Sequence, residues 1–184
     1  PVLRAQDFRV YGRFVRERFD DFVWENDKVA FRMYGEALET WEKEPLTSSS
    51  VDAWVKKTPK LVVNEWYLVD DYHKDHGEGG DFYSAGKTRG CGGTGVLKDG
   101  RLFVSRNFRR SRVLTRGPIR LVFELDYDAW DVAGTQVRET KRVTLDAGSN
   151  FSRFESRYST PEGGPLPAGL SLAAGVKKEK GADV

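Results

Sequence analysis

The sequence predicts an all-β protein built as an antiparallel β-sandwich. Three observations predict it: many short runs alternate apolar and polar residues, turn-forming residues separate these runs, and apolar residues at helical spacing are scarce. The clearest run is 119–127, where apolar residues alternate strictly with mostly polar ones. A chain of 184 residues, 39% of them hydrophobic, is expected to form one domain over residues 1–184 with its own core.

The N-terminal part predicts strands joined by tight turns. Residues 4–18 alternate loosely, which predicts one or two strands broken at Gly12. Two β-rich runs within 18–35 flank residues 25–28, whose Asn and Asp favour a hairpin turn. Successive side chains of a strand point to opposite faces, so Arg32 and Tyr34 are expected side by side, on a face that can be exposed.

The rest of the chain adds one short helix and further strands. Apolar residues at helical spacing predict a short helix over residues 36–44. The mostly apolar run 61–69 is interpreted as a buried strand that leads into a long loop. Further strands are expected at these positions: 51–57, 101–105, 136–146, 151–158 and 170–176.

The amino-acid composition limits the kinds of function that this chain can have. Thirty Lys and Arg against 28 Asp and Glu give a net charge of +2, which provides no global argument for nucleic acid or an anionic membrane surface. No apolar run approaches the roughly 18 residues that a membrane helix needs. Cys91 is the only cysteine, so an internal disulfide or a thiolate metal cluster is excluded. The last residues follow an apolar segment, and we expect the native chain to continue past Val184.

The segment 70–99 carries the chemistry. It holds both histidines, His73 and His76, and is dense in glycine, which suits sharp turns and close approach to the backbone. If the backbone is extended, His73 and Asp75 point the same way, and a carboxylate beside an imidazole favours a general base. A solvated loop is the plain alternative. A divalent metal held by His73, Asp75 and His76 is another, although their spacing matches no strong ligand signature.

Arginines and tyrosines complete the set of candidates. Arg32 and Arg89 can bind a carboxylate through two parallel hydrogen bonds, whereas the arginines of 106–112 are interpreted as surface charge. The tyrosines with polar neighbours are the better functional candidates among the aromatic residues, and they are Tyr34, Tyr72 and Tyr83. The tryptophans are expected to fill the sandwich instead. Cys91 is interpreted as a small residue in a turn.

Two segments together, residues 20–35 and 71–83, resemble the family DUF4861, and Gly117-Pro118-Ile119-Arg120 adds to the resemblance. The resemblance implies a secreted bacterial, carbohydrate-active protein, periplasmic or extracellular, with a β-sandwich of the galactose-mutarotase-like or supersandwich type. An oligosaccharide dehydratase that acts on uronic-acid products of ulvan breakdown is similar to this group. Family members look longer, so this chain is expected to be an N-terminal portion.

Elimination from a uronic acid requires loss of the proton next to the carboxylate, after the charge of that carboxylate is neutralised. For such a dehydratase or lyase we assign His73 as base, Tyr72, Tyr34 or His76 as acid, and Arg32 or Arg89 as neutraliser. The expected substrate is an oligosaccharide, and its candidate binding residues are Arg32, Arg89, Asn26, Asp75, Glu78 and Tyr83. No cofactor is required with certainty, and a divalent metal remains an option.

Two alternatives to elimination stay open. A glycoside hydrolase would need two carboxylates that flank the scissile bond, and Asp75, Glu78 and Asp81 could supply them. A non-catalytic carbohydrate-binding module would need only an aromatic platform with polar groups around it, and it would tolerate loss of His73.

Overall fold

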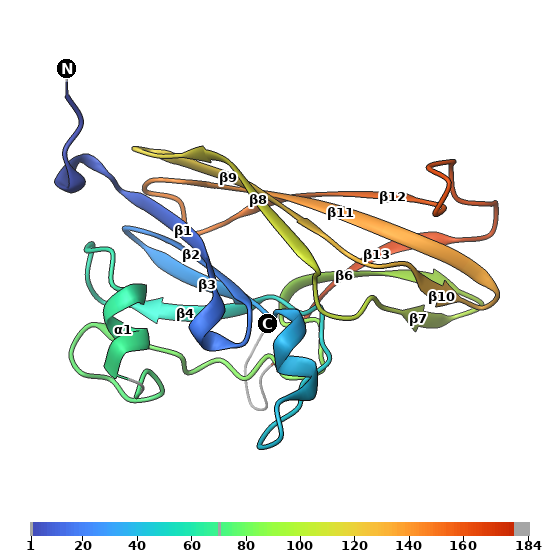
Figure 1. Ribbon diagram of the computed structural model, residues 1–184, viewed down its shortest axis with the longest axis horizontal. Coiled ribbons are helices and arrows are strands. Elements are labelled where there is room, and N and C mark those ends of the chain that lie inside the picture. The colour runs from blue at the N-terminus through green and yellow to red at the C-terminus, as the bar shows by residue number, and fades with distance from the viewer. Residues whose placement is uncertain (1, 70, 179–184) are drawn as a thin grey trace.

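A computed structural model describes residues 2–69 and 71–178 as two stacked layers of antiparallel strands (Figure 1). One layer is a five-stranded sheet in which each strand pairs with the next in sequence. Its strands are β1 (Val10–Val15), β2 (Asp21–Asn26), β3 (Val29–Met33), β4 (Asp52–Lys56) and β5 (Gly79–Gly80).

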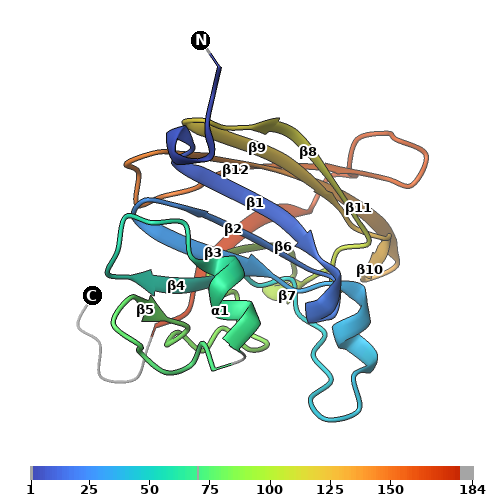
Figure 2. The same ribbon diagram turned by 60° about the vertical axis from the view of Figure 1, so that its left-hand side comes forward.

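The other layer is a sheet in the order β10-β11-β9-β8, with β12 paired to the free side of β11. These strands are β8 (Arg110–Arg116), β9 (Arg120–Asp126), β10 (Trp130–Val132), β11 (Thr135–Asp146) and β12 (Arg153–Ser159). A small third sheet contains β13 (Ser171–Val176), β6 (Cys91–Lys98) and β7 (Arg101–Phe103). Turned by 60°, the molecule shows β8 and β9 above β1 and β2 (Figure 2). The predicted all-β, sandwich-like fold is confirmed.

The main core lies between the two layers. Phe22 of β2 stacks on Phe123 of β9 with ring centroids 4.1 Å apart, and Trp24 packs at a tilt against the same ring with centroids 5.1 Å apart. Leu121, Phe123 and Leu125 are fully buried, as the alternation predicts. Ile119 is 63% exposed, because β9 begins one residue later. Burial of large aromatic side chains on both faces is what holds the layers together.

The segment 61–69 corrects the prediction of a buried strand, because it forms the helix α1 (Val63–Val69). The Glu25 carboxylate of β2 accepts hydrogen bonds from the backbone N–H groups of Val62 and Val63, each at 3.0 Å. These groups would otherwise lack partners at the start of a helix. The buried side chains Val63 and Trp66 then pack into a second apolar cluster beneath the sheet. An unalternating apolar run fits a helix or a strand equally, so periodicity alone did not decide.

Two further predictions are corrected. β1 runs through Gly12 without a break, and glycine is there because a Cβ would lie 2.6 Å from Leu121. Part of the predicted loop 70–99 is the strand β6, in which Gly95 lets the carbonyl of Phe103 approach closely. The arginine-rich stretch also contains a strand, β8. The short helix expected over 36–44 is the 3-10 helix η3 (Glu36–Thr40). Two other 3-10 helices lie earlier in the chain, η1 (Ala5–Asp7) and η2 (Arg16–Arg18).

No helix in the described ranges is both long and apolar enough to cross a bilayer.

Glu25 should be a main determinant of stability, because it pairs at 2.6 Å with Lys56 while both side chains are fully buried. Glu25→Ala would leave the Lys56 charge and two N–H groups of α1 without their partner. We expect a loss of about 3–5 kcal/mol in the free energy of unfolding, measured by urea denaturation. Glu25→Gln should cost less than Glu25→Ala but still destabilise the protein, since it keeps an acceptor for α1.

The matched control is Glu17→Ala, which removes a carboxylate that pairs with Arg13 while 58% exposed. It should cost less than about 1 kcal/mol. Equal losses for the two alanine variants would contradict the role given to Glu25.

Candidate functional site

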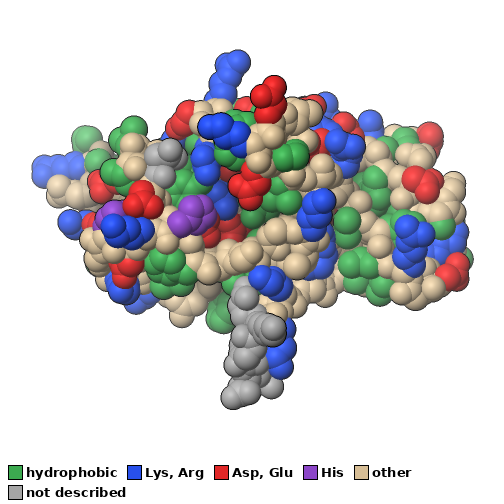
Figure 3. Space-filling view, turned by 90° about the horizontal axis from the view of Figure 1, so that it is seen from below, with side chains coloured by type: hydrophobic (Ala, Val, Ile, Leu, Met, Phe, Trp, Pro, Cys, Tyr) green, Lys and Arg blue, Asp and Glu red, His purple; other side chains and the backbone are tan. Residues whose placement is uncertain are grey.

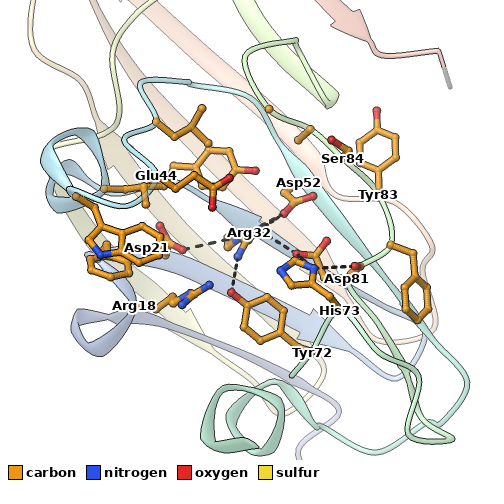
Figure 4. Close-up of a pocket in the computed structure, with 18 residues that line it drawn as sticks. Arg18, Asp21, Arg32, Glu44, Asp52, Tyr72, His73, Asp81, Tyr83 and Ser84 are labelled. Carbon is orange, nitrogen blue, oxygen red and sulfur yellow. Dashed lines mark hydrogen bonds and ion pairs between the residues drawn. The ribbon is translucent and has the colours of Figure 1, made fainter. Parts of the chain in front are cut away.

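A pocket of about 390 Å³ opens beside β3 and β4 (Figure 4). Its walls come from the end of η2, from β2–β4, from η3 and the residues after it, and from the segment 72–86. Seen from below, both histidines lie on this face with acidic side chains beside them (Figure 3). Five of the residues assigned from the sequence line the pocket, namely Arg32, Tyr34, Tyr72, His73 and Tyr83.

Arg32 forms the floor of the pocket and is only 8% exposed. Its Nη2 lies 2.6 Å from Asp52 Oδ2 and 3.0 Å from Asp81 Oδ2, and its Nε lies 3.1 Å from Asp52 Oδ2. A third carboxylate, Asp21, is 4.0 Å away. Burial by itself lowers the pKa of Arg32, but the attraction of Asp52 and its neighbours outweighs burial and raises that pKa well above its usual value. The prediction that Arg32 and Tyr34 share a face is confirmed, but that face is buried rather than exposed.

Two of the carboxyl groups around Arg32, those of Asp21 and Asp81, hold protons unusually well. Burial raises the pKa of Asp21 to about 7 and that of Asp81 to about 6, although Arg32 opposes both shifts. Asp52, at 1% exposure, is the cross-strand partner of Arg32, and its Oδ1 has no hydrogen-bond partner among the described residues. One arginine therefore faces three aspartates, two of which can exchange a proton near neutral pH.

His73 lies at the mouth of the pocket with a 64% exposed side chain. Its Nδ1 is 3.2 Å from the backbone oxygen of Asp81 and 3.6 Å from Asp81 Oδ2. Both neighbours are acceptors while Asp81 is ionised, so Nδ1 carries the proton and Nε2 keeps a free lone pair. This arrangement gives the imidazole the tautomer that a general base needs.

Two tyrosine hydroxyls lie close to Arg32. Tyr72 Oη accepts a hydrogen bond from Arg32 Nη1 at 3.4 Å, and the guanidinium carbon lies 5.2 Å from the ring centre of Tyr34. Burial raises the pKa of both phenols, so both stay protonated near neutral pH and can donate a proton or a hydrogen bond. Tyr83 contributes its ring to the wall, while its hydroxyl donates to the backbone oxygen of Lys177 at 3.2 Å.

The aromatic side of the pocket carries a second arginine. Phe19 and Trp41 stack with ring centroids 4.4 Å apart. The Arg18 guanidinium, half-buried, lies 5.0 Å from the centre of the Tyr72 ring and 6.0 Å from that of Trp41. Sequence reasoning missed Arg18, and it also missed the roles of Asp21 and Asp52. The one available signal was charged residues inside β-rich runs, such as Asp21 beside Phe22.

The other residues assigned from the loop 70–99 lie outside the pocket. Asp75 pairs with Lys57 and accepts hydrogen bonds from the N–H groups of Gly77 and Gly79, and the Lys57 hydrogen bond is the main reason that its pKa falls to about 2. His76 Nε2 lies 3.2 Å from the backbone oxygen of Asp71, and Glu78 does not line the pocket. The loop thus divides into a part that faces the pocket and a part that shapes the turn.

Asn26 and Arg89 also lie elsewhere. The Asn26 side chain accepts hydrogen bonds from Lys28 and Val29 and donates to the backbone oxygens of Asp146 and Ser149, which ties the β2–β3 hairpin to the end of β11. Arg89 donates to Ser49 Oγ and to the Thr94 carbonyl, each at 3.1 Å. Both side chains therefore hold backbone segments in place.

In the part of the chain that the structure describes, no three His, Cys, Asp or Glu side chains are arranged to hold a metal ion. His73, Asp75 and His76 are therefore not gathered around a common point.

Residues 3–182 match the family described as Domain of unknown function (DUF4861). The chain belongs to this family. It is 44% identical over 171 residues to "Uncharacterized protein P7" of Formosa agariphila, and the match covers 88% of this chain and 43% of that protein. The chain thus spans less than half the length of this relative. No solved structure matches it.

Stability should fall with rising pH because of Asp21. An aspartate in the unfolded chain titrates near pH 4, whereas folded Asp21 titrates near pH 7, so the folded state binds this proton more tightly. Between about pH 4 and 7 the folded protein should lose roughly 1–3 kcal/mol through this group. Asp21→Asn keeps an acceptor for the Gly35 N–H and should flatten the fall, measured by denaturant unfolding across this range.

Asp99→Asn is the matched control, because Asp99 is an exposed turn residue with φ of 49° that asparagine also tolerates. Its pH dependence should equal that of the unmodified protein. The same slope in Asp21→Asn would show that Asp21 does not carry the effect.

Proposed function

We propose that this chain carries the active site of a carbohydrate-active enzyme, periplasmic or extracellular, that acts on uronic-acid-containing oligosaccharides by proton abstraction and elimination. The leaving group would be water in a dehydratase, or the oxygen of the next sugar in a lyase. The observation that carries the proposal is the contact of His73 Nδ1 with Asp81 at the mouth of the pocket, which leaves Nε2 as an accessible base.

His73 would remove the proton next to the substrate carboxylate. Asp81 fixes the tautomer and stabilises the imidazolium that forms, which is the role a carboxylate plays behind a histidine base. The electron pair of the broken C–H bond becomes the new C=C bond, and the C–O bond on the neighbouring carbon breaks. The leaving oxygen takes a proton from Tyr34 or Tyr72, and transfer of the His73 proton to that tyrosine restores the enzyme.

Arg18 offers a second positive charge in the pocket, beside that of Arg32, to neutralise the substrate carboxylate. The N–H groups of Arg32 are directed at Asp52, Asp81 and Tyr72, so its charge is already balanced within the floor. Arg18 lies over the rings of the pocket wall and is half-buried. Protonation of Asp21 near neutral pH would reduce the negative charge of the floor and favour an anionic sugar.

Two other functions have some support from particular observations. The raised pKa of Asp81, which lines the pocket, is a property of the acid in a glycoside hydrolase. The stacked rings of Phe19 and Trp41 would suit a carbohydrate-binding module. Elimination accounts for more of the pocket, because it also uses His73 and the protonated phenols.

Replacing His73 should separate these functions. With a panel of unsaturated uronic-acid oligosaccharides, mass spectrometry should show loss of one water for a dehydratase, or shorter unsaturated products for a lyase. His73→Gln should reduce turnover by roughly 10²–10⁴-fold, since it removes the base. Far-UV circular dichroism should be unchanged, because the side chain is largely exposed.

Lys74→Ala is the control, as it alters the neighbouring exposed side chain of the same loop and should keep full turnover. Full turnover in His73→Gln would reject His73 as the base. Cleavage products whose summed mass exceeds that of the substrate by one water would replace elimination with glycoside hydrolysis. Sugar binding without turnover would favour the binding module.

A further inference from the structure

A second hollow, of about 470 Å³, lies across β8, β9, β11 and β12 and shares no lining residue with the pocket. β11 shows how it is built: odd-numbered residues from Val137 to Leu145 are buried in the core, while the even-numbered ones face outward. Five arginines line the hollow, namely Arg110, Arg112, Arg138, Arg142 and Arg157.

Strand register arranges the outward side chains in rows across the sheet. One row reads Arg110, Asp126, Thr140, Arg157, since these residues are successive cross-strand partners. The neighbouring row begins with Arg112, Glu124 and Arg142. Adjacent strands lie about 4.8 Å apart, so a row across four strands extends over roughly 14 Å. Such a surface can hold several units of a linear ligand at once.

Acidic side chains in the middle of the rows hold part of this surface in place. Glu124 receives hydrogen bonds from Arg112 and from Arg142, the latter at 2.6 and 2.9 Å, and the Arg112 hydrogen bond is the main cause of its lowered pKa. The Thr140 hydroxyl donates to Asp126 at 2.7 Å. These contacts hold Arg112 and Arg142 in fixed positions beside the hollow.

Arg138 and Arg157 differ from the other arginines here. Within residues 2–69 and 71–178, neither side chain has an ion-pair or hydrogen-bond partner, and both residues are exposed. Because Arg157 pairs with Thr140 and Arg138 with Ser159, the two are diagonal neighbours on one face, with Cα atoms roughly 7–8 Å apart. Arginine side chains that start this close together can reach one oxyanion from two sides with their planar guanidinium groups.

We propose that this hollow binds the carboxylate or sulfate groups of an acidic polysaccharide, with Arg138 and Arg157 as the clamp on one such group. The rows favour a sugar chain, because arginines at their ends suit anionic groups while Thr140 and Asp126 between them suit hydroxyls. The inference rests on the proposed function only for the class of ligand. Binding here would hold a polymer on a surface separate from the pocket.

The test compares polygalacturonate for the carboxylate source, dextran sulfate for the sulfate source, and uncharged dextran, by affinity gel electrophoresis at low and moderate salt. The full chain should bind at least one polyanion and not dextran. The double variant Arg138→Ala/Arg157→Ala should weaken that binding by about tenfold or more. Arg138→Lys/Arg157→Lys should restore only part of it, since lysine keeps the charge but lacks the planar fork.

The charge-matched control is Arg16→Ala/Arg116→Ala, which removes two exposed arginines that lie outside the hollow. It should change binding by less than about twofold. If the two double alanine variants weaken polyanion binding equally, net charge accounts for the effect and the proposed clamp is rejected. Absence of polyanion binding, or tighter binding of single-stranded RNA through the same two arginines, would overturn the assignment to a sugar.

His73→Gln distinguishes this inference from the proposed function. It should abolish turnover while leaving polyanion binding unchanged. Conversely, Arg138→Ala/Arg157→Ala should keep turnover of short oligosaccharides that do not need a second surface.

Discussion

The buried charge of Arg32 is the constraint on which the candidate site depends. A guanidinium at 8% exposure is tolerated only if carboxylates compensate for its lost hydration, and here they come from β2, β4 and the residue after β5. One side chain thereby fixes four successive segments of the first sheet relative to one another. Asp81, which this interaction holds in place, in turn orients His73. The exposed imidazole therefore depends on a charge balance made beneath it.

The same interaction bears on the protons of two neighbouring carboxyl groups. Asp21 is fully buried and 4.0 Å from Arg32, whereas Asp81 accepts a hydrogen bond from it at 3.0 Å. At both groups burial outweighs the attraction of Arg32, so the pKa of each carboxyl group is raised. A site built in this way carries a reserve of protons close to the mouth of its pocket.

Sequence patterns predicted the parts of the fold that depend on local alternation. The β2–β3 hairpin and β9 followed from period-two alternation and turn residues, and so did the common face of Arg32 and Tyr34. The helix α1 did not follow, because Glu25, which satisfies its first N–H groups, lies 37 residues earlier in the chain. Likewise the glycines of β6 led to the prediction of a loop, because the sequence does not show that the Phe103 carbonyl lies close to Gly95.

The candidate site was predictable to a similar extent. Polar residues near the glycine-rich loop led to His73 and Tyr72, but nothing local indicated that Asp52 would pair with Arg32 across 20 residues. Asn26 was assigned to the substrate from the sequence, and the structure shows its buried amide in hydrogen bonds that tie two sheets together. Such contacts depend on strand register between distant segments, which a single sequence does not encode in any short pattern.

The strict alternation of β11 has a consequence for how this protein can change over evolutionary time. Its inward residues include the fully buried pair Glu139 and Lys141, so a substitution of either residue should lower the stability of the whole sandwich. Its even-numbered residues, such as Arg138 and Thr140, face outward instead. Descendants of this chain could therefore diversify what the outer surface recognises, one position at a time, while inheriting the same interior unchanged.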